Sequence, residues 1–81
     1  MKVFCNRFGQ ISINQEIVAE IRDGTIDCCE FYRAGIEEMI RSYYGEFAGN
    51  DSLIGLSKNL LSLARSFGGI HLSSHYMRGH I

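Results

Sequence analysis

A chain of 81 residues has enough side chains to build one hydrophobic core and too few to build two. A chain this short buries only about 60% of the surface that its unfolded form exposes, so a single domain spanning residues 1–81 is expected. Hydrophobic residues make up 46% of the sequence and charged residues 21%, which is far from the composition of disordered chains. The chain should therefore fold, alone or as an oligomer.

The sequence contains no apolar run near the ~20 residues that are needed to cross a bilayer. The first seven residues become polar too early for the core of a signal peptide. Three cysteines form no closed set of disulfides, and the adjacent Cys28 and Cys29 are poorly placed to pair with each other. We therefore expect a cytoplasmic protein with reduced thiols and no membrane partner.

Both ends of the chain favour β-strands. Residues 2–8 are rich in β-forming side chains, and Gly9-Gln10 suits a two-residue hairpin turn before a second strand that starts at residues 11–13. Residues 70–77 alternate between apolar side chains and His or Ser. This alternation predicts a C-terminal strand that joins the N-terminal hairpin in one sheet.

Residues 14–23 fit two structures. Polar and apolar residues alternate through most of the segment, as in a strand. The same segment fits a short helix with Asn14 as its N-cap and Gly24 just after its end. The helix is the preferred interpretation, and the strand remains the alternative.

A longer helix is predicted from about Cys28 to Phe47, because the apolar residues there recur with the helical period. Asp27 is expected to cap it, with Glu30 three residues later in the spacing of a capping box. Its opposite face carries charged residues at i, i+4 spacing, as on an ordinary solvated surface.

A second long helix is predicted to start after a cap at Asp51 or Ser52 and to end near Phe67, before Gly68-Gly69. The expected fold class is thus α+β. A small antiparallel sheet, built from the N-terminal hairpin and the C-terminal strand, packs on two main helices, with a third short helix if residues 14–23 are helical.

The sequence lacks the motifs of catalysis and of metal binding. In a strand, His71 and His75 would lie roughly 13 Å apart at about 3.3 Å per residue, too far to share one tetrahedral ion, and there is no C-x-x-C pair. Cys28 and Cys29 stand near a predicted helix start, which lowers a thiol's pKa, but nothing in the sequence brings a histidine to them. We expect a protein with no catalytic residues, metal site or cofactor.

Charge is unevenly distributed along the chain. All 9 carboxylate side chains lie in the first 51 residues, and from residue 52 onwards the charged side chains are Lys58, Arg65 and Arg78. This asymmetry fits either attraction between the two halves of one fold or a basic patch that meets an anionic partner.

Nucleic-acid binding is the alternative function. A short helix at residues 14–23, the Asp23-Gly24 turn and the next helix would imitate a helix-turn-helix, with Arg7, Lys58, Arg65 and Arg78 near phosphates. The acidic residues of the would-be recognition helix, Glu30, Glu37 and Glu38, argue against it, since they would repel the phosphate backbone.

The helix at residues 52–67 has more apolar residues than one core-facing stripe requires. The core stripe is expected to be Leu53, Leu56, Leu60, Leu63, Ala64 and Phe67. Ile54 and Leu61 lie outside it and alternate with Lys58 and Arg65, which is the pattern of a helix that docks on a partner or dimerises. The alternative is that the N-terminal hairpin or the C-terminal strand covers this second apolar strip.

Two aromatic residues of the preceding helix, Phe31 and Tyr44, also point away from its core-facing side, and exposed aromatics are favoured interface anchors. The expected function is therefore binding to another protein or complex, with Ile54, Lys58, Leu61, Arg65, Phe31 and Tyr44 as the contact residues and a homodimer as one form of it. Small domains without catalytic motifs are often accessory regulators or inhibitors, including phage-encoded proteins that disable host defence complexes.

Overall fold

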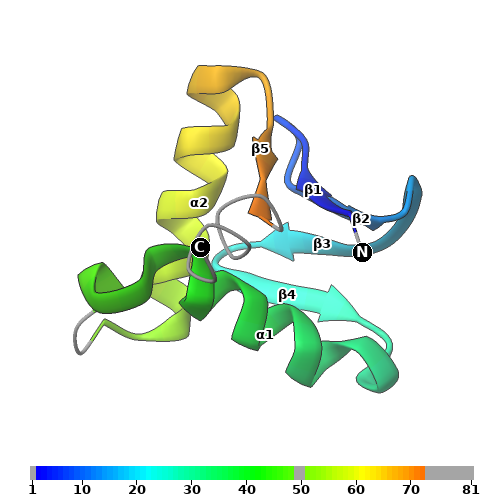
Figure 1. The fold of residues 1–81 in the computed structure, drawn as a ribbon, viewed down its shortest axis with the longest axis horizontal. Coiled ribbons are helices and arrows are strands. Elements are labelled where there is room, and N and C mark those ends of the chain that lie inside the picture. The colour runs from blue at the N-terminus through cyan, green and yellow to red at the C-terminus, as the bar shows by residue number, and fades with distance from the viewer. Residues whose placement is uncertain (1, 49–50, 73–81) are drawn as a thin grey trace, which may run out of the picture.

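The computed structural model describes residues 2–48 and 51–72, and they form an α+β fold, as the sequence predicted (Figure 1). A five-stranded antiparallel sheet packs against two helices. The elements in chain order are β1 (Val3–Cys5), β2 (Gln10–Ile13), β3 (Glu16–Arg22), β4 (Thr25–Cys28), α1 (Glu30–Tyr44), a 3-10 turn (Gly45–Ala48), α2 (Leu53–Phe67) and β5 (Ile70–His71).

The sheet has the strand order β4-β3-β2-β1-β5, so four consecutive strands form a meander and β5 closes it beside β1. Cys5 pairs with Ile70 and Phe4 with His71, which confirms the predicted contact between the N-terminal hairpin and a C-terminal strand. The part of the predicted strand after residue 72 lies outside the described residues. β3 and β4 run across the view in Figure 1 while β5 runs nearly upright, which shows how strongly the sheet twists.

The preferred helix at residues 14–23 is wrong, because residues 16–22 form β3. Asn14 and Gln15 both have positive φ, as the two central residues of a tight hairpin turn require, so Asn14 turns the chain instead of capping a helix. Asp23 and Gly24, with φ of 52° and 80°, form a second such turn. The strand alternation is interrupted at Val18, where the pairing of β2 with β3 shifts register.

The turn between β1 and β2 is longer than the predicted Gly9-Gln10 pair. Gln10 already belongs to β2, and the side-chain oxygen of Asn6 accepts hydrogen bonds from the backbone N–H groups of Phe8 (2.9 Å) and Gln10 (3.0 Å). The backbone N–H of Asn6 donates a 3.0 Å hydrogen bond to the Gln10 carbonyl, so residues 7–9 form a three-residue loop, and Gly9, with a φ of 84°, lies in the left-handed region. The Asn6 side chain therefore fixes where Arg7 and Phe8 project.

α1 begins at Glu30, two residues later than predicted, because the preceding residues continue the sheet as β4. Asp27 pairs with Glu20 in the sheet and does not cap the helix; the N-cap is Cys29, whose side chain makes no capping hydrogen bond. The regular helix ends at Tyr44, and the chain continues as the 3-10 turn.

α2 is the best-predicted element. The Ser52 side chain accepts a hydrogen bond from the backbone N–H of Gly55, and Gly68 ends the helix in the left-handed conformation, as the cap residues implied. Of the expected core stripe, Leu56, Leu60 and Ala64 are buried, whereas Phe67 is 70% exposed because it is the last helical residue.

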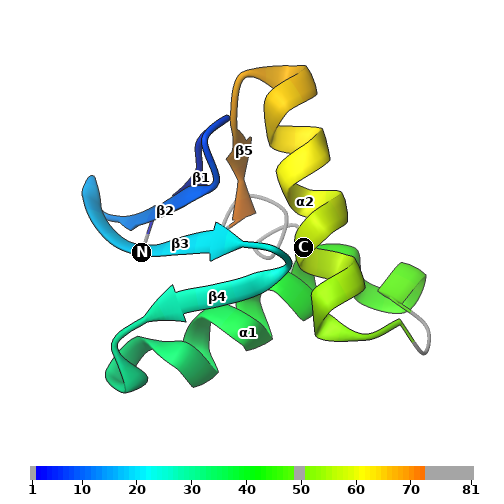
Figure 2. The same cartoon turned by 180° about the vertical axis from the view of Figure 1, so that it is seen from behind.

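Both helices pack on the same face of the sheet, the face that carries the buried side chains of the strands. The buried core contains residues of all five strands and both helices: Val3, Cys5, Ile11, Ala19, Ile21, Ile26, Ile36, Ile40, Leu56, Leu60, Ala64, Ile70 and Leu72. Figure 2, the view from behind, shows β4 in front of α1 and β3 on the far side of β4 from that helix. The Ser57 side chain is also buried in this core, and its hydroxyl has no hydrogen-bond partner among the described residues.

The free edge of β4 is protected by α1. Arg33 Nη1 donates a 2.8 Å hydrogen bond to the Ile26 carbonyl, and its Nε donates one to Glu30 Oε1. Arg22 and Thr25 are the closing pair of the β3–β4 hairpin, so the carbonyl of the next residue, Ile26, points to the open edge of the sheet. By bonding this carbonyl, Arg33 blocks a position at which another strand could pair.

Candidate protein-binding surfaces

The second apolar strip predicted on α2 consists of Ile54, Lys58, Leu61 and Arg65, and we call it the α2 strip. It lies against the tips of two hairpins. A methyl group added at Gly24 would lie 2.6 Å from Ile54 Cγ2 and 3.0 Å from Lys58 Cε, so both side chains rest on the β3–β4 turn.

Leu61 of the strip rests on the β1–β2 hairpin turn. A methyl group at Gly9 would lie 3.1 Å from Leu61 Cδ1 and 3.7 Å from Ile21 Cβ. Leu61 is consequently half-buried and packs against the core. The N-terminal hairpin thus covers Leu61, as in the alternative interpretation, and the β3–β4 turn, which that interpretation did not include, covers part of Ile54 and Lys58. Ile54 nevertheless stays 48% exposed, and Lys58 and Arg65 are exposed.

The contact at Gly9 extends this surface beyond α2, because Arg7 and Phe8 belong to the same turn. Phe8 is 66% exposed, and the Arg7 guanidinium carbon lies 5.0 Å from the centre of its ring, within the range of a cation–π contact. We call the α2 strip together with Arg7 and Phe8 the cationic surface. Phe8 has no sequence signal as a contact residue, since the contact of its turn with α2 depends on tertiary structure.

The cations of this surface are available to a partner. Arg7, Lys58 and Arg65 form no ion pair with any residue that the structure describes. α2 itself contains no carboxylate side chain. Asp23 precedes Gly24 in the β3–β4 turn, on which Ile54 rests. It too makes no ion pair with a described residue.

Tyr44 lies at the α1–α2 junction, where it lines a separate surface hollow with Ser52, Gly55 and Asn59. It is half-buried against the core at the junction of the two helices, and its hydroxyl donates a 2.6 Å hydrogen bond to Asn59 Oδ1, with the Leu56 carbonyl oxygen 3.4 Å away. Burial raises the pKa of Tyr44 to about 12. Tyr44 therefore connects α1 to α2, and the structure separates it from the α2 strip residues with which it was grouped.

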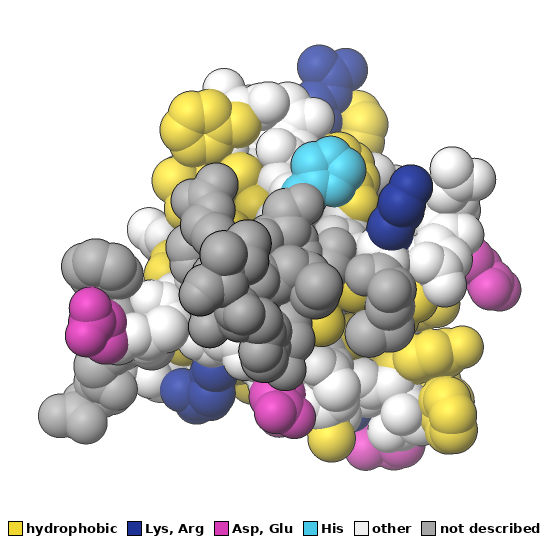
Figure 3. Space-filling model, in the orientation of Figure 1, with side chains coloured by type: hydrophobic (Ala, Val, Ile, Leu, Met, Phe, Trp, Pro, Cys, Tyr) yellow, Lys and Arg dark blue, Asp and Glu magenta, His cyan; other side chains and the backbone are white. Residues whose placement is uncertain are grey.

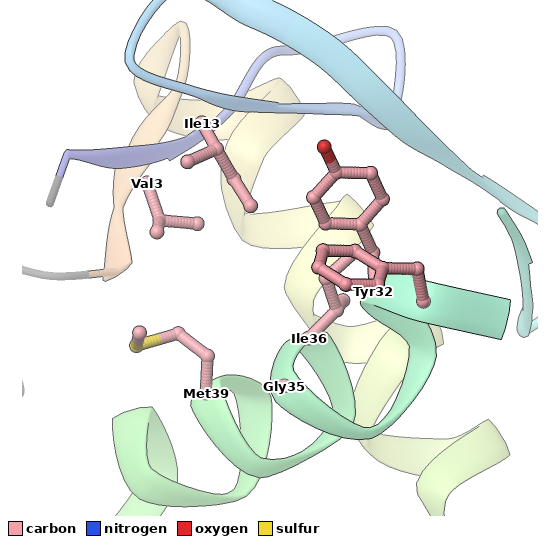
Figure 4. Close-up of a pocket in the computed structure, with 7 residues that line it drawn as sticks. Val3, Ile13, Tyr32, Gly35, Ile36 and Met39 are labelled. Atoms are coloured by element: carbon pink, nitrogen blue, oxygen red, sulfur yellow. The ribbon is translucent and has the colours of Figure 1, made fainter. Parts of the chain in front are cut away.

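Phe31 is 84% exposed, and it lies at the edge of an apolar hollow between α1 and the sheet. We call this hollow the apolar groove. Its volume is about 250 Å³, and it is lined by Val3, Ile13, Phe31, Tyr32, Gly35, Ile36 and Met39. Figure 4 shows Val3 and Ile13 on the sheet side and Met39 and Tyr32 on α1 across the opening.

Gly35 forms part of the floor of the apolar groove. A Cβ built at this residue meets no atom within 4 Å apart from its own helix turn and chain neighbours. The ring of Phe31 stands edge-on to that of Tyr32, with 5.1 Å between ring centres, which keeps Phe31 at the rim. The groove is thus an open apolar depression with an aromatic side chain at its edge.

Two carboxylates are neighbours of groove-lining residues, one across the sheet and one along α1. Glu38 stands three residues after Gly35 on α1, and Glu16 is the cross-strand neighbour of Ile13. Both are exposed, and neither forms an ion pair with a described residue. In Figure 3, acidic side chains lie along the lower edge of the molecule, where α1 runs, close to exposed apolar side chains.

The thiols of Cys5 and Cys28 show no sign of activation. Burial is the main cause that raises the pKa of Cys28, and it raises that of Cys5 to about 11. Cys28 belongs to β4, and α1 begins at Glu30, so Cys28 does not lie at the helix start that the sequence suggested. Among residues 2–48 and 51–72, no three His, Cys, Asp or Glu side chains come together as they would around a metal ion; His75 and His80 lie outside the described residues.

Comparison with known proteins finds no matching family model, no matching curated protein and no matching solved structure. In the described part of the chain, neither helix has the length and apolar character of a membrane span.

Proposed function

We propose that this protein acts by binding another protein through its cationic surface, and that the bound element is an acidic segment with apolar side chains. The observation that supports this most directly is the composition of the surface. It combines three cations without ion pairs in the described chain, Arg7, Lys58 and Arg65, with exposed Phe8 and Ile54. Complementary charge steers and orients a partner, and the apolar side chains supply burial.

The cationic surface is also held in place before any partner arrives. Ile54 and Lys58 rest on Gly24, and Leu61 rests on Gly9, so α2 and the two hairpin tips are fixed relative to one another. A preformed surface loses less conformational entropy on binding than a mobile one does. The protein would then act by occupying its partner's surface, in the manner of an accessory regulator or inhibitor.

Nucleic-acid binding is the competing proposal, because arginine and lysine next to an aromatic ring also suit a phosphate backbone and bases. The helix-turn-helix version is not formed here, since residues 16–22 are β3. A cluster of three cations is small for a duplex, whose non-specific affinity depends on many phosphate contacts.

A synthetic peptide tests the proposal, with glutamates on one helical face and leucines on the other, labelled for fluorescence anisotropy. The protein is expected to bind it at low salt and to lose at least about tenfold in affinity with the double substitution Lys58→Glu and Arg65→Glu. Arg41→Glu is the matched control, because Arg41 is an exposed cation on α1 away from this surface, and it should bind like the wild type.

Two results would contradict the proposal. One is peptide affinity that is the same in the double variant and in the wild type. The other is tighter binding to random duplex DNA than to the peptide, with a steep dependence on salt, which would favour the nucleic-acid function.

A further inference from the structure

The chain carries a second surface whose chemistry is the complement of the first. The cationic surface combines exposed Phe8, beneath the Arg7 guanidinium, with the cations of α2, whereas the apolar groove has Glu16 and Glu38 next to its lining residues Ile13 and Met39. A protruding aromatic side chain with cationic neighbours is complementary in shape and charge to a recess with anionic neighbours.

We infer that the apolar groove of one molecule is occupied by the cationic surface of a second copy of this chain. This inference rests on the proposed function, because it names a partner for the same cationic surface. A groove of about 250 Å³ has room for one large side chain, and Phe8, 66% exposed, is the most exposed of the apolar side chains of the cationic surface.

The charges around the groove favour this occupant. Adjacent strand residues point to opposite faces, so Lys2, next to the lining residue Val3, is directed away from the groove. Arg33 is held by Glu30 and by the Ile26 carbonyl. Glu16 and Glu38 are left as the carboxylates beside the groove without an ion pair in the described chain.

The two surfaces of one molecule cannot meet each other. The groove is formed by α1 with β1 and β2, the cationic surface by α2 with the hairpin tips, and both are built on one packed core. Contact between them must be made by two molecules, and because the surfaces differ, the contact is head-to-tail. A second copy bound in this way would compete with an acidic partner for the cationic surface.

A mixing experiment with two variants tests the inference. Lys58→Glu with Arg65→Glu removes the cationic surface and keeps the groove. Gly35→Leu fills the groove and keeps the cationic surface, and the open space at Gly35 and its ordinary helical conformation allow the fold to persist. Ala34→Leu, at the neighbouring exposed position outside the groove, is the control for added volume.

Sedimentation velocity at low salt should show that the wild type and Ala34→Leu self-associate. The Lys58→Glu, Arg65→Glu double variant and the Gly35→Leu variant should each self-associate at least about tenfold more weakly. An equimolar mixture of those two variants should form one-to-one dimers, because each supplies the half that the other lacks. Association of the wild type should weaken as salt rises.

The inference is overturned if the wild type stays monomeric at low salt, or if the mixture stays monomeric while the wild type associates. Binding of the acidic peptide to the cationic surface in the same sample would show that the proposed function stands while this inference fails. If the wild type neither binds the peptide nor self-associates, the proposed function and this inference are both rejected.

Discussion

Three glycine-to-alanine substitutions separate the forces that hold α2 against the hairpins. At Gly68, with φ of 73° and no neighbour within 4 Å of an added methyl group, only backbone strain is introduced, and a left-handed residue with a Cβ costs roughly 1–2 kcal/mol. At Gly24 the same strain is joined by a clash with Ile54. At Gly35 there is neither.

The expected magnitudes follow from those surroundings. A methyl group at Gly24 would lie 2.6 Å from Ile54 Cγ2 and 3.1 Å from the Ile54 carbonyl oxygen, which the helix backbone holds in place. Overpacking of this kind costs about 1–3 kcal/mol, so Gly24→Ala should destabilise the protein by about 3 kcal/mol in all. Gly35→Ala should stabilise it by about 0.5–1 kcal/mol, because alanine favours the helix.

Thermal and urea unfolding followed by circular dichroism measure these differences. Each kcal/mol corresponds to about 4–8 °C in the midpoint temperature of a domain of this size. The order of stability should be Gly35→Ala, wild type, Gly68→Ala and then Gly24→Ala. If Gly24→Ala is no less stable than Gly68→Ala, the α2 strip does not rest on the β3–β4 turn, and the preformed surface argued above is refuted.

Four further predictions concern the core, its polar atoms and the sheet edge. Leu60→Ala should cost about 2–5 kcal/mol in urea unfolding, whereas Phe67→Ala should change stability by less than about 0.5 kcal/mol, since Leu60 is fully buried and Phe67 is 70% exposed. Ser57→Ala should stabilise the fold by about 1 kcal/mol, because it removes a buried hydroxyl without a partner in the described chain; a destabilised variant would reveal a hydrogen bond to that hydroxyl. Because the pKa of Cys5 rises from 9.0 unfolded to about 11 folded, the native state holds a proton that the unfolded state releases, so stability should fall between pH 9 and 11 and fall less in Cys5→Ala. Arg33→Met should expose the Ile26 carbonyl and raise the aggregation rate measured by light scattering, with Arg41→Met unchanged as the control.

Local signals predicted α2 well. Ser52 can cap, the apolar period is unbroken and Gly68 supplies the left-handed stop, and these features act within one segment. Residues 14–23 gave the wrong result because their signals are ambiguous. Asn and Asp favour a helix cap and also tolerate the positive φ of a tight turn, and the irregularity at Val18 disguised the strand alternation.

The candidate surfaces could be predicted only in part. The apolar period of α2 indicated Ile54 and Leu61, but not that Gly24 and Gly9 would lie beneath them, since those contacts join residues far apart in the sequence. The apolar groove gave no sequence signal, because it exists only where Val3 of β1 faces Met39 of α1. Phe31 was correctly predicted to be exposed. The same prediction was wrong for Tyr44, which is half-buried because its hydroxyl hydrogen-bonds Asn59 on α2.

The strand order has a consequence for the order of folding. β1 to β4 are neighbours in both sequence and sheet, joined by short turns, so their contacts close small loops and should form quickly. The pairing of Phe4 with His71 closes nearly the whole described chain and should form last. During synthesis, the outer edge of β1 and the Phe4 ring stay open to water and to other chains until β5 has emerged and packed Gly69 beneath that ring.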